Sequence, residues 1–197
     1  MKCPKLLAAL LLYLGFCSLS PPASAAINGM NLGASYDSQQ ANITFRVYSS
    51  QATRLALYLY SSGYGAQESA IYLLSPAGNG VWSVTVPVSA IQAAGIGGAV
   101  YYGYRAWGPN WPYSASWSKG SAAGFVADVD SSGNRFNPNK LLLDPYAREV
   151  SQDPINPQNQ NGNIFATGPN TDPSFGTAYR LIDSGSYAPK EIGRAHV

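Results

Sequence analysis

The sequence predicts an all-β fold, an antiparallel β-sandwich or barrel, and three observations support it. Between about residue 28 and residue 107, short runs rich in β-branched and aromatic residues are separated by clusters of Gly, Pro, Asn and Ser. Within several runs apolar and polar residues alternate, as expected for strands with one buried face. A single short segment in this region can form a helical turn. We therefore assign residues 26–150 to one β domain.

The first two predicted strands show the pattern most clearly. Ala41–Ser49 places Ile43, Phe45 and Val47 on one face and polar or aromatic residues on the other. Arg54–Ser61 carries apolar or aromatic residues on both faces, which is typical of a strand in the middle of a sheet.

The later elements are shorter and are divided by dense turn sequences. We expect a strand at 70–74, a turn at 76–80, a strand at 81–87, one helical turn at 88–94 and an aromatic strand at 99–107. Gly103 inside the last strand indicates a bulge or the close approach of another group. A long Gly-, Ser- and Trp-rich excursion at 109–135 follows, and residues 136–150 close the domain.

The first 25 residues have the organisation of an export signal. Lys2 and Lys5 provide the positive start, residues 6–16 the apolar stretch and Ala23–Ala25 the small-residue cleavage site. The apolar stretch is shorter than the roughly 20 residues that cross a bilayer. We expect a secreted or periplasmic product.

Removing this signal changes the chemistry that is open to the chain. Cys3 and Cys17 both lie within it, so disulfides and cysteine metal sites are excluded from the mature protein. The loss of Lys2 and Lys5 leaves 10 Lys and Arg against 10 Asp and Glu. A neutral surface argues against nucleic acid or an anionic membrane as a partner. The 14 Tyr and 4 Trp suit either neutral polar ligands such as sugars or an aromatic β core.

The carboxyl-terminal part differs in composition from the predicted β domain. Residues 151–190 are rich in Asn, Gln, Pro and Gly and are interpreted as an irregular linker. The last seven residues, EIGRAHV at 191–197, are the peptide that a common sequencing adapter encodes when it is read in frame. We hypothesise that this is a non-native tail, which would make His196, the only histidine, foreign.

Two motifs occur in an order that resembles a known family. Tyr102–Pro109 (YGYRAWGP) and Phe136–Ala147 (FNPNKLLLDPYA) resemble paired segments of the amino-terminal domain of isoamylase-type enzymes in glycoside hydrolase family 13. The resemblance implies an immunoglobulin-like β-sandwich related to family 48 carbohydrate-binding modules.

In that family the sandwich precedes a (β/α)8 barrel that hydrolyses α-1,6 branch points of glycogen and amylopectin. The resemblance therefore implies an α-glucan as partner of the parent enzyme and packing of the sandwich on the barrel. The family's catalytic carboxylates lie on barrel strands, and their motifs do not occur here. We assign no catalytic residue and expect no hydrolysis by this chain.

Four aromatic residues are the candidate sugar-binding set: Trp107, Trp111, Tyr113 and Trp117. Flat aromatic faces can stack on glucose rings while the indole N–H and phenol O–H groups form hydrogen bonds. The alternative is that these rings pack over the sandwich edge or against the barrel.

Asp144 precedes a proline, which favours a turn in which its carboxylate accepts backbone N–H groups. The alternative is a ligand contact. In the turn interpretation, Leu141–Leu143 pack in the core.

Two acidic regions are candidates for calcium binding. Asp128–Gly133 resembles the start of a calcium loop, but Asn139 stands where the closing Glu should be, which favours solvated loop acids. By resemblance to secreted isoamylases, Asp153 is half of a structural calcium site whose other ligands lie on the barrel. Calcium is therefore expected only in the longer enzyme.

Two other classes of function remain open. One is a freestanding secreted starch- or glycogen-binding module, which would bind amylopectin by itself. The other is a structural or adhesion β-domain, which would bind no glucan and leaves the paired motifs unexplained.

Overall fold

A computed structural model describes residues 31–151 and 179–193, and the remaining residues are left out of the description. The elements, in chain order, are β1 Gly33–Tyr36, β2 Asn42–Tyr48, β3 Arg54–Tyr60, β4 Ala70–Leu73, β5 Ser75–Gly78, β6 Val81–Pro87, α1 Val88–Ala93, β7 Val100–Trp107, η3 Tyr179–Leu181 and β8 Glu191–Gly193. Within this part of the chain no helix is long and apolar enough to cross a membrane.

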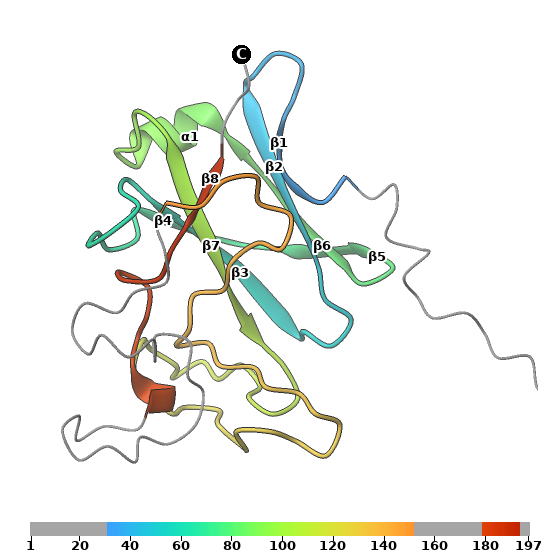
Figure 1. Ribbon diagram of the computed structural model, residues 1–197. Coiled ribbons are helices and arrows are strands. Elements are labelled where there is room, and N and C mark those ends of the chain that lie inside the picture. The colour runs from blue at the N-terminus through green and yellow to red at the C-terminus, as the bar shows by residue number, and fades with distance from the viewer. Residues whose placement is uncertain (1–30, 152–178, 194–197) are drawn as a thin grey trace, which may run out of the picture. The chain divides into compact units, whose positions relative to one another are not determined.

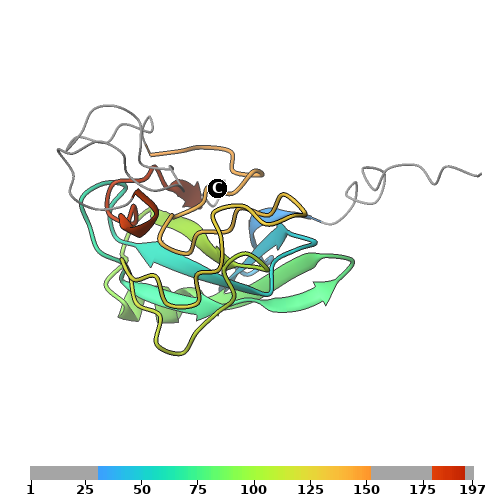
Figure 2. The same cartoon turned by 90° about the horizontal axis from the view of Figure 1, so that it is seen from below.

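The strands form two four-stranded antiparallel sheets (Figure 1). Sheet A has the order β1-β2-β6-β5 and sheet B the order β4-β3-β7-β8. In Figure 2 the red and orange segments of the chain lie over one side of this pair of sheets. The prediction of an all-β, immunoglobulin-like antiparallel sandwich is confirmed.

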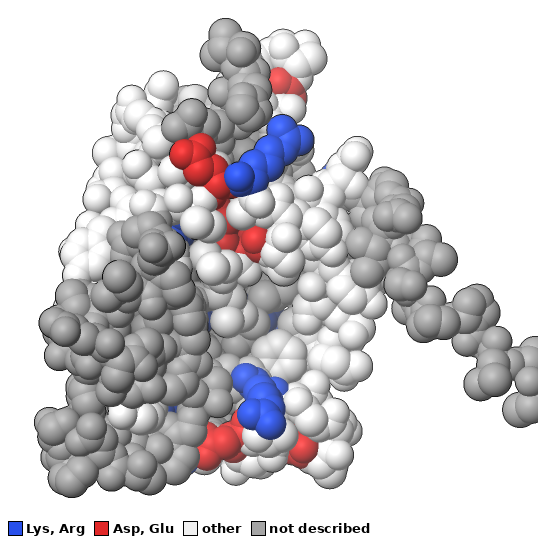
Figure 3. Space-filling view, in the orientation of Figure 1, with Lys and Arg blue, Asp and Glu red and all other residues white. Residues whose placement is uncertain are grey.

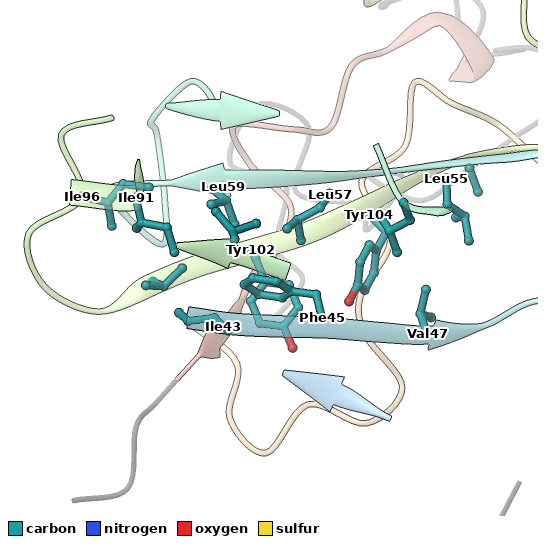
Figure 4. Close-up of a cluster of buried hydrophobic side chains, with 14 residues drawn as sticks. Ile43, Phe45, Val47, Leu55, Leu57, Leu59, Ile91, Ile96, Tyr102 and Tyr104 are labelled. Carbon is teal, nitrogen blue, oxygen red and sulfur yellow. The ribbon is translucent and has the colours of Figure 1, made fainter. Parts of the chain in front are cut away.

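The core between the sheets follows from the alternation in the strands. Ile43, Phe45 and Val47 of β2 are buried, as predicted, and face alternate residues of β3 and β7. Figure 4 shows these side chains meeting, with Phe45 and Tyr102 in edge-to-face contact at a ring-centroid distance of 5.0 Å. Ile91 of α1 closes one end of this core.

The predicted elements from residue 41 to residue 107 are present, and three short strands were missed. β1 lacks an apolar alternation, while β5 contains Pro76 and Gly78 in a region predicted to be a turn. Both are edge strands, where proline is tolerated because one row of N–H groups needs no partner. β8 lies at 191–193, outside the predicted β domain.

Gly103 is a site of close approach, one of the two alternatives that its place in the strand suggested. A Cβ atom at this position would lie 2.7 Å from Cγ of Leu141, whose side chain covers β7 from outside. Gly97, in contrast, has no atom within 4 Å of its Cβ position.

We predict that Gly103→Ala destabilises the protein by about 1 to 3 kcal/mol, because the added methyl group overpacks the contact with Leu141. Urea unfolding monitored by tryptophan fluorescence measures this. Gly97→Ala is the matched control and should change stability by less than about 1 kcal/mol. Equal effects of the two substitutions would contradict the close packing at Gly103.

Candidate functional site

The outer face of sheet B is where the conspicuous aromatic and charged residues gather. Because successive strand residues point to opposite sides, β3 and β7 turn aromatic residues and Arg105 away from the main core. Loops and the segment 179–190 cover this face and form a second buried cluster. Its buried members are Ala56, Tyr58, Tyr60, Trp107, Trp111, Leu141 and Ala188.

Two of the four predicted sugar-binding residues are buried in this cluster. Trp107 is 2% exposed and Trp111 is 1% exposed. The indole N–H of Trp111 donates to the carbonyl oxygen of Ala123 at 2.9 Å, and its ring packs edge-on against Phe125. Neither indole has a free face to present to a ligand.

The structure brings three of the four residues together. Trp107 contacts the rings of Tyr113 and Trp117 at centroid distances of 5.6 and 5.0 Å. Tyr113 is 44% exposed, and the guanidinium carbon of Arg54 lies 3.9 Å from its ring centroid. The sugar-binding role stays a prediction, and Tyr113 is the member of the set with the largest accessible surface.

A buried ion pair ties the segment 179–190 to sheet B. Arg105 is fully buried, and its Nη2 lies 2.5 Å from Oδ1 of Asp183. Its Nη1 donates to the carbonyl oxygen of Pro138 at 2.8 Å, and its guanidinium lies over the ring of Tyr58. Burial disfavours the charged form, but the Asp183 carboxylate together with Tyr60 and Tyr58 outweighs this, and the pKa of Arg105 is raised.

Two buried lysines reinforce the same attachment. Lys140 Nζ donates to the carbonyl oxygens of Tyr179 and Ile182 at 2.7 and 3.0 Å. Lys190 Nζ donates to those of Gly63 and Ala188 at 3.2 and 3.1 Å. Burial lowers the pKa of each lysine to about 8. Arg105 and the two lysines therefore all contact this segment, and main-chain carbonyl oxygens satisfy much of their hydrogen bonding.

Sequence reasoning missed this network, although a signal was present. Arg105 and Lys140 are charged residues within the largely apolar runs YYGYRAW and NKLLLDP. A charge in a buried run has to be paired or hydrogen-bonded inside the protein, so each of these positions indicates a buried polar contact. Asp183 gave no such signal, because it lies in a polar stretch far along the chain.

The predicted linker and tail are only partly described. Residues 179–190 pack on sheet B, with Ser184, Ala188 and Lys190 buried, so this part of the assigned linker belongs to the packed structure. Residues 152–178 and 194–197 lie outside the description. Residues 191–193 form β8 beside β7, which does not test the origin of the tail; the domain boundaries and the tail stay predictions.

Asp144 takes the turn role that its sequence context favoured. Its Oδ1 accepts the backbone N–H of Tyr146 at 2.9 Å, and its Oδ2 accepts the hydroxyl of Tyr102 at 2.9 Å. The expectation that Leu141–Leu143 all pack in the core is wrong for two of them. Leu141 is buried, but Leu142 and Leu143 are exposed, because Leu142 pairs its backbone with Tyr104 and the chain then turns outward.

A second carboxyl group lies against Asp144. Glu191 is fully buried, and its Oε1 accepts the backbone N–H of Asp144, while Oε2 has no hydrogen-bond partner. Burial raises the pKa of Glu191 to about 8, and the nearby Asp144 carboxylate adds to the shift. Burial also raises the pKa of Asp144.

The carboxylates of the acidic loop make contacts within the fold. Asp128 forms an ion pair with Arg180 at 2.9 Å, and Asp130 accepts the backbone N–H groups of Ser132 and Asn134. Asn139 is buried and hydrogen-bonded to neighbouring main chain. Among residues 31–151 and 179–193, no three His, Cys, Asp or Glu side chains gather to hold a metal ion. Asp153, the predicted half-site, lies outside the described residues.

The two antiparallel sheets with their aromatic outer cluster define an immunoglobulin-like β-sandwich of the kind found in carbohydrate-binding modules. Residues 31–147 match the family model described as carbohydrate-binding module 48 (isoamylase N-terminal domain). The chain belongs to this family.

The similar curated proteins are named isoamylase or glycogen debranching enzyme. The isoamylase of Pseudomonas amyloderamosa is 71% identical over 193 residues, which is 98% of this chain and 24% of that protein. The isoamylase of a Flavobacterium species is 57% identical over 192 residues, which is 96% of this chain and 23% of that protein. The chain thus spans about a quarter of the length of these two curated relatives.

Solved structures of pullulanases also match at low identity. The pullulanase of Paenibacillus barengoltzii, in complex with maltohexaose and alpha-cyclodextrin, has a TM-score of 0.37 and 22% identity. The match covers 61% of this chain and 13% of that one.

We predict that Asp183→Asn lowers the free energy of unfolding by about 3 kcal/mol, because it leaves the buried Arg105 charge without its partner. Chemical denaturation at pH 7 measures the loss. The control is Glu68→Gln, which removes the partly exposed ion pair with Lys119 and should cost less than about 1 kcal/mol. A loss as small as that of the control would show that the Arg105 pair does not hold the segment.

The raised pKa of Glu191 predicts a pH-dependent stability. The protonated carboxyl is favoured in the fold, so its contribution is complete below pH 4.5 and is lost as the pH rises towards about 8. Lys140 and Lys190 affect stability in a different pH range. Because burial favours their neutral forms, they add stability only as the pH rises above about 8.

We therefore expect Glu191→Gln to gain stability relative to the unmodified chain as the pH is raised from 5 to 8. Urea unfolding at each pH unit gives the difference between the two proteins. Parallel curves over this range would contradict a buried, protonated Glu191.

Proposed function

We propose that this chain is the amino-terminal accessory part of an exported debranching glycosidase that hydrolyses α-1,6 branch points of glycogen or amylopectin. The observation that carries the proposal is the 71% identity to an isoamylase over 98% of this chain, together with the family match at residues 31–147. Residues 1–25 are proposed to direct export.

The chemistry of hydrolysis is assigned to the part of the parent enzyme beyond this stretch. Retaining glycosidases need two carboxyl groups roughly 5 to 5.5 Å apart across a bound sugar. The buried carboxyl pair of Asp144 and Glu191 has another role: one oxygen of each accepts a backbone N–H group within the fold. In the longer enzyme, Asp153 is proposed to contribute one ligand to a structural calcium ion.

Contact with α-glucan by the sandwich itself is the second part of the proposal. Tyr113 is its candidate, because its ring is accessible and is held in place by Trp107 and Arg54. A freestanding starch-binding module remains the alternative function, since the same residue could serve it.

We predict that the purified chain releases no reducing ends from glycogen, which a reducing-sugar assay with isoamylase as positive control measures. Hydrolysis by the chain would contradict the assignment of catalysis to the rest of the enzyme. An amylopectin pull-down tests glucan contact by the sandwich. Retention that is lost in Tyr113→Ala but kept in the exposed control Tyr64→Ala would support Tyr113 as the contact residue, and no retention of the unmodified chain would eliminate the freestanding module.

A further inference from the structure

The turn between β5 and β6 consists of an asparagine followed by a glycine. Gly78 of β5 pairs with Val81 of β6, so Asn79 and Gly80 form the whole connection. Their φ angles are 49° and 76°, both in the left-handed region, as a two-residue type I′ turn requires. Asn79 is exposed, and Figure 1 shows the turn at the free end of the β5–β6 hairpin.

This turn places a nucleophile directly after a reactive amide. Attack of the main-chain nitrogen of Gly80 on Cγ of the Asn79 side chain closes a five-membered ring. Among the described residues, no hydrogen bond occupies either the Gly80 N–H group or the Asn79 side-chain amide. Glycine has no side chain to shield its nitrogen, and its backbone rotates more freely than that of other residues. Ring closure is therefore less hindered here than at other asparagines.

The other described asparagines lack this combination, because each precedes a residue that has a side chain. They are Asn31, Asn42, Asn110, Asn134, Asn137 and Asn139. Asn110, Asn137 and Asn139 are also buried. Asn42 and Asn134 donate their side-chain amides to the carboxylates of Asp37 and Asp130, which holds those amides in place.

We propose that Asn79 is a site of spontaneous chemical modification, at which asparagine converts to aspartate and isoaspartate; this change does not depend on the proposed function. The Gly80 nitrogen forms a bond to Cγ, and the bond from Cγ to the side-chain nitrogen breaks. That nitrogen leaves as ammonia and takes the proton that the Gly80 nitrogen gives up. Water then opens the cyclic imide. Cleavage of the Cγ–N bond gives aspartate, and cleavage of the bond from this nitrogen to the main-chain carbonyl carbon gives isoaspartate.

The aspartate product changes the charge of the hairpin and leaves its main chain unaltered. Residues 69–104 include no Asp, Glu, Lys or Arg. In Figure 3 the charged side chains of the visible face lie mainly towards its two ends. A carboxylate at position 79 is therefore the only charge on β5 and β6, and ion-exchange chromatography separates the modified chain from the unmodified one.

The isoaspartate product changes the geometry of the turn. Its main chain runs through Cγ and is one atom longer, whereas the two-residue turn is held on both sides. The carbonyl oxygen of Gly80 accepts the N–H of Ser49 at 2.8 Å. A Cβ atom at Gly80 would lie 2.8 Å from the ring of Tyr48, so this residue has no room to move towards β2. We therefore expect isoaspartate to disrupt the pairing of Gly78 with Val81.

The test is peptide mapping by mass spectrometry after the purified chain is stored in neutral buffer, with isoaspartate identified by an isoaspartate-specific methyltransferase. Because the Gly80 nitrogen is unshielded, we expect at least about tenfold more conversion at Asn79 than at any other described asparagine. Conversion should be faster in alkaline than in mildly acidic buffer, because the attacking nitrogen has to lose its proton. Asn79→Gln should slow conversion at this position strongly, since the longer side chain would have to close a six-membered ring.

The chain contains an internal control for the effect of the fold. Asn28 and Asn161 also precede glycine, but they lie outside the described residues. Conversion at Asn28 or Asn161 without conversion at Asn79 would show that the folded turn prevents ring closure, and it overturns the proposal. The proposal is equally overturned if no asparagine converts, or if Asn79 converts no faster than the other described asparagines.

Asn79→Asp is the matched control for the effect on the hairpin, because it adds the charge without lengthening the main chain. In the isolated isoaspartate form, the amide of Val81 should exchange hydrogen at least about tenfold faster than in the unmodified chain. In Asn79→Asp its exchange should change less than about twofold. Similar exchange rates in these two modified proteins would contradict the proposed disruption of the turn by isoaspartate.

Discussion

The burial of Arg105 in the middle of sheet B is the constraint on which the rest of the structure depends. An isolated charge on a sheet face is far too costly to bury, so this face needs a carboxylate and additional carbonyl oxygens from elsewhere in the chain. Asp183 provides the carboxylate, and Pro138 provides one of the carbonyl oxygens. The segments that carry these residues therefore have to lie on the sheet.

This requirement explains how the chain covers the outer face. Segment 136–141 inserts Leu141 against Gly103, and segment 179–190 closes over Tyr58 and Tyr60. Most of the aromatic residues on this face are buried in the second cluster and are not accessible to a sugar. Exposed apolar residues near its margins include Tyr113 and, along 142–150, Leu142, Leu143, Tyr146 and Val150.

Sequence alone predicted the features that depend on local pattern. Alternation identified β2 and β3, aromatic content identified β7, and a lone glycine in that strand indicated a bulge or a close approach, of which the structure shows the close approach. It did not identify which tryptophans are exposed, because that depends on how the excursion after β7 folds back over Trp107 and Trp111. It also missed β8 and the docking of 179–190, since neither has apolar periodicity and both are held by side chains distant in sequence.

A double-mutant cycle between Arg105 and Asp183 tests the central constraint most directly. Asp183→Asn is measured in the natural background and again with Arg105→Met, in which no buried charge is left to pair. If the pair holds the covering segment, the substitution is costly only when Arg105 is present, with a coupling free energy of about 2 kcal/mol or more. A coupling below about 0.5 kcal/mol would contradict the account.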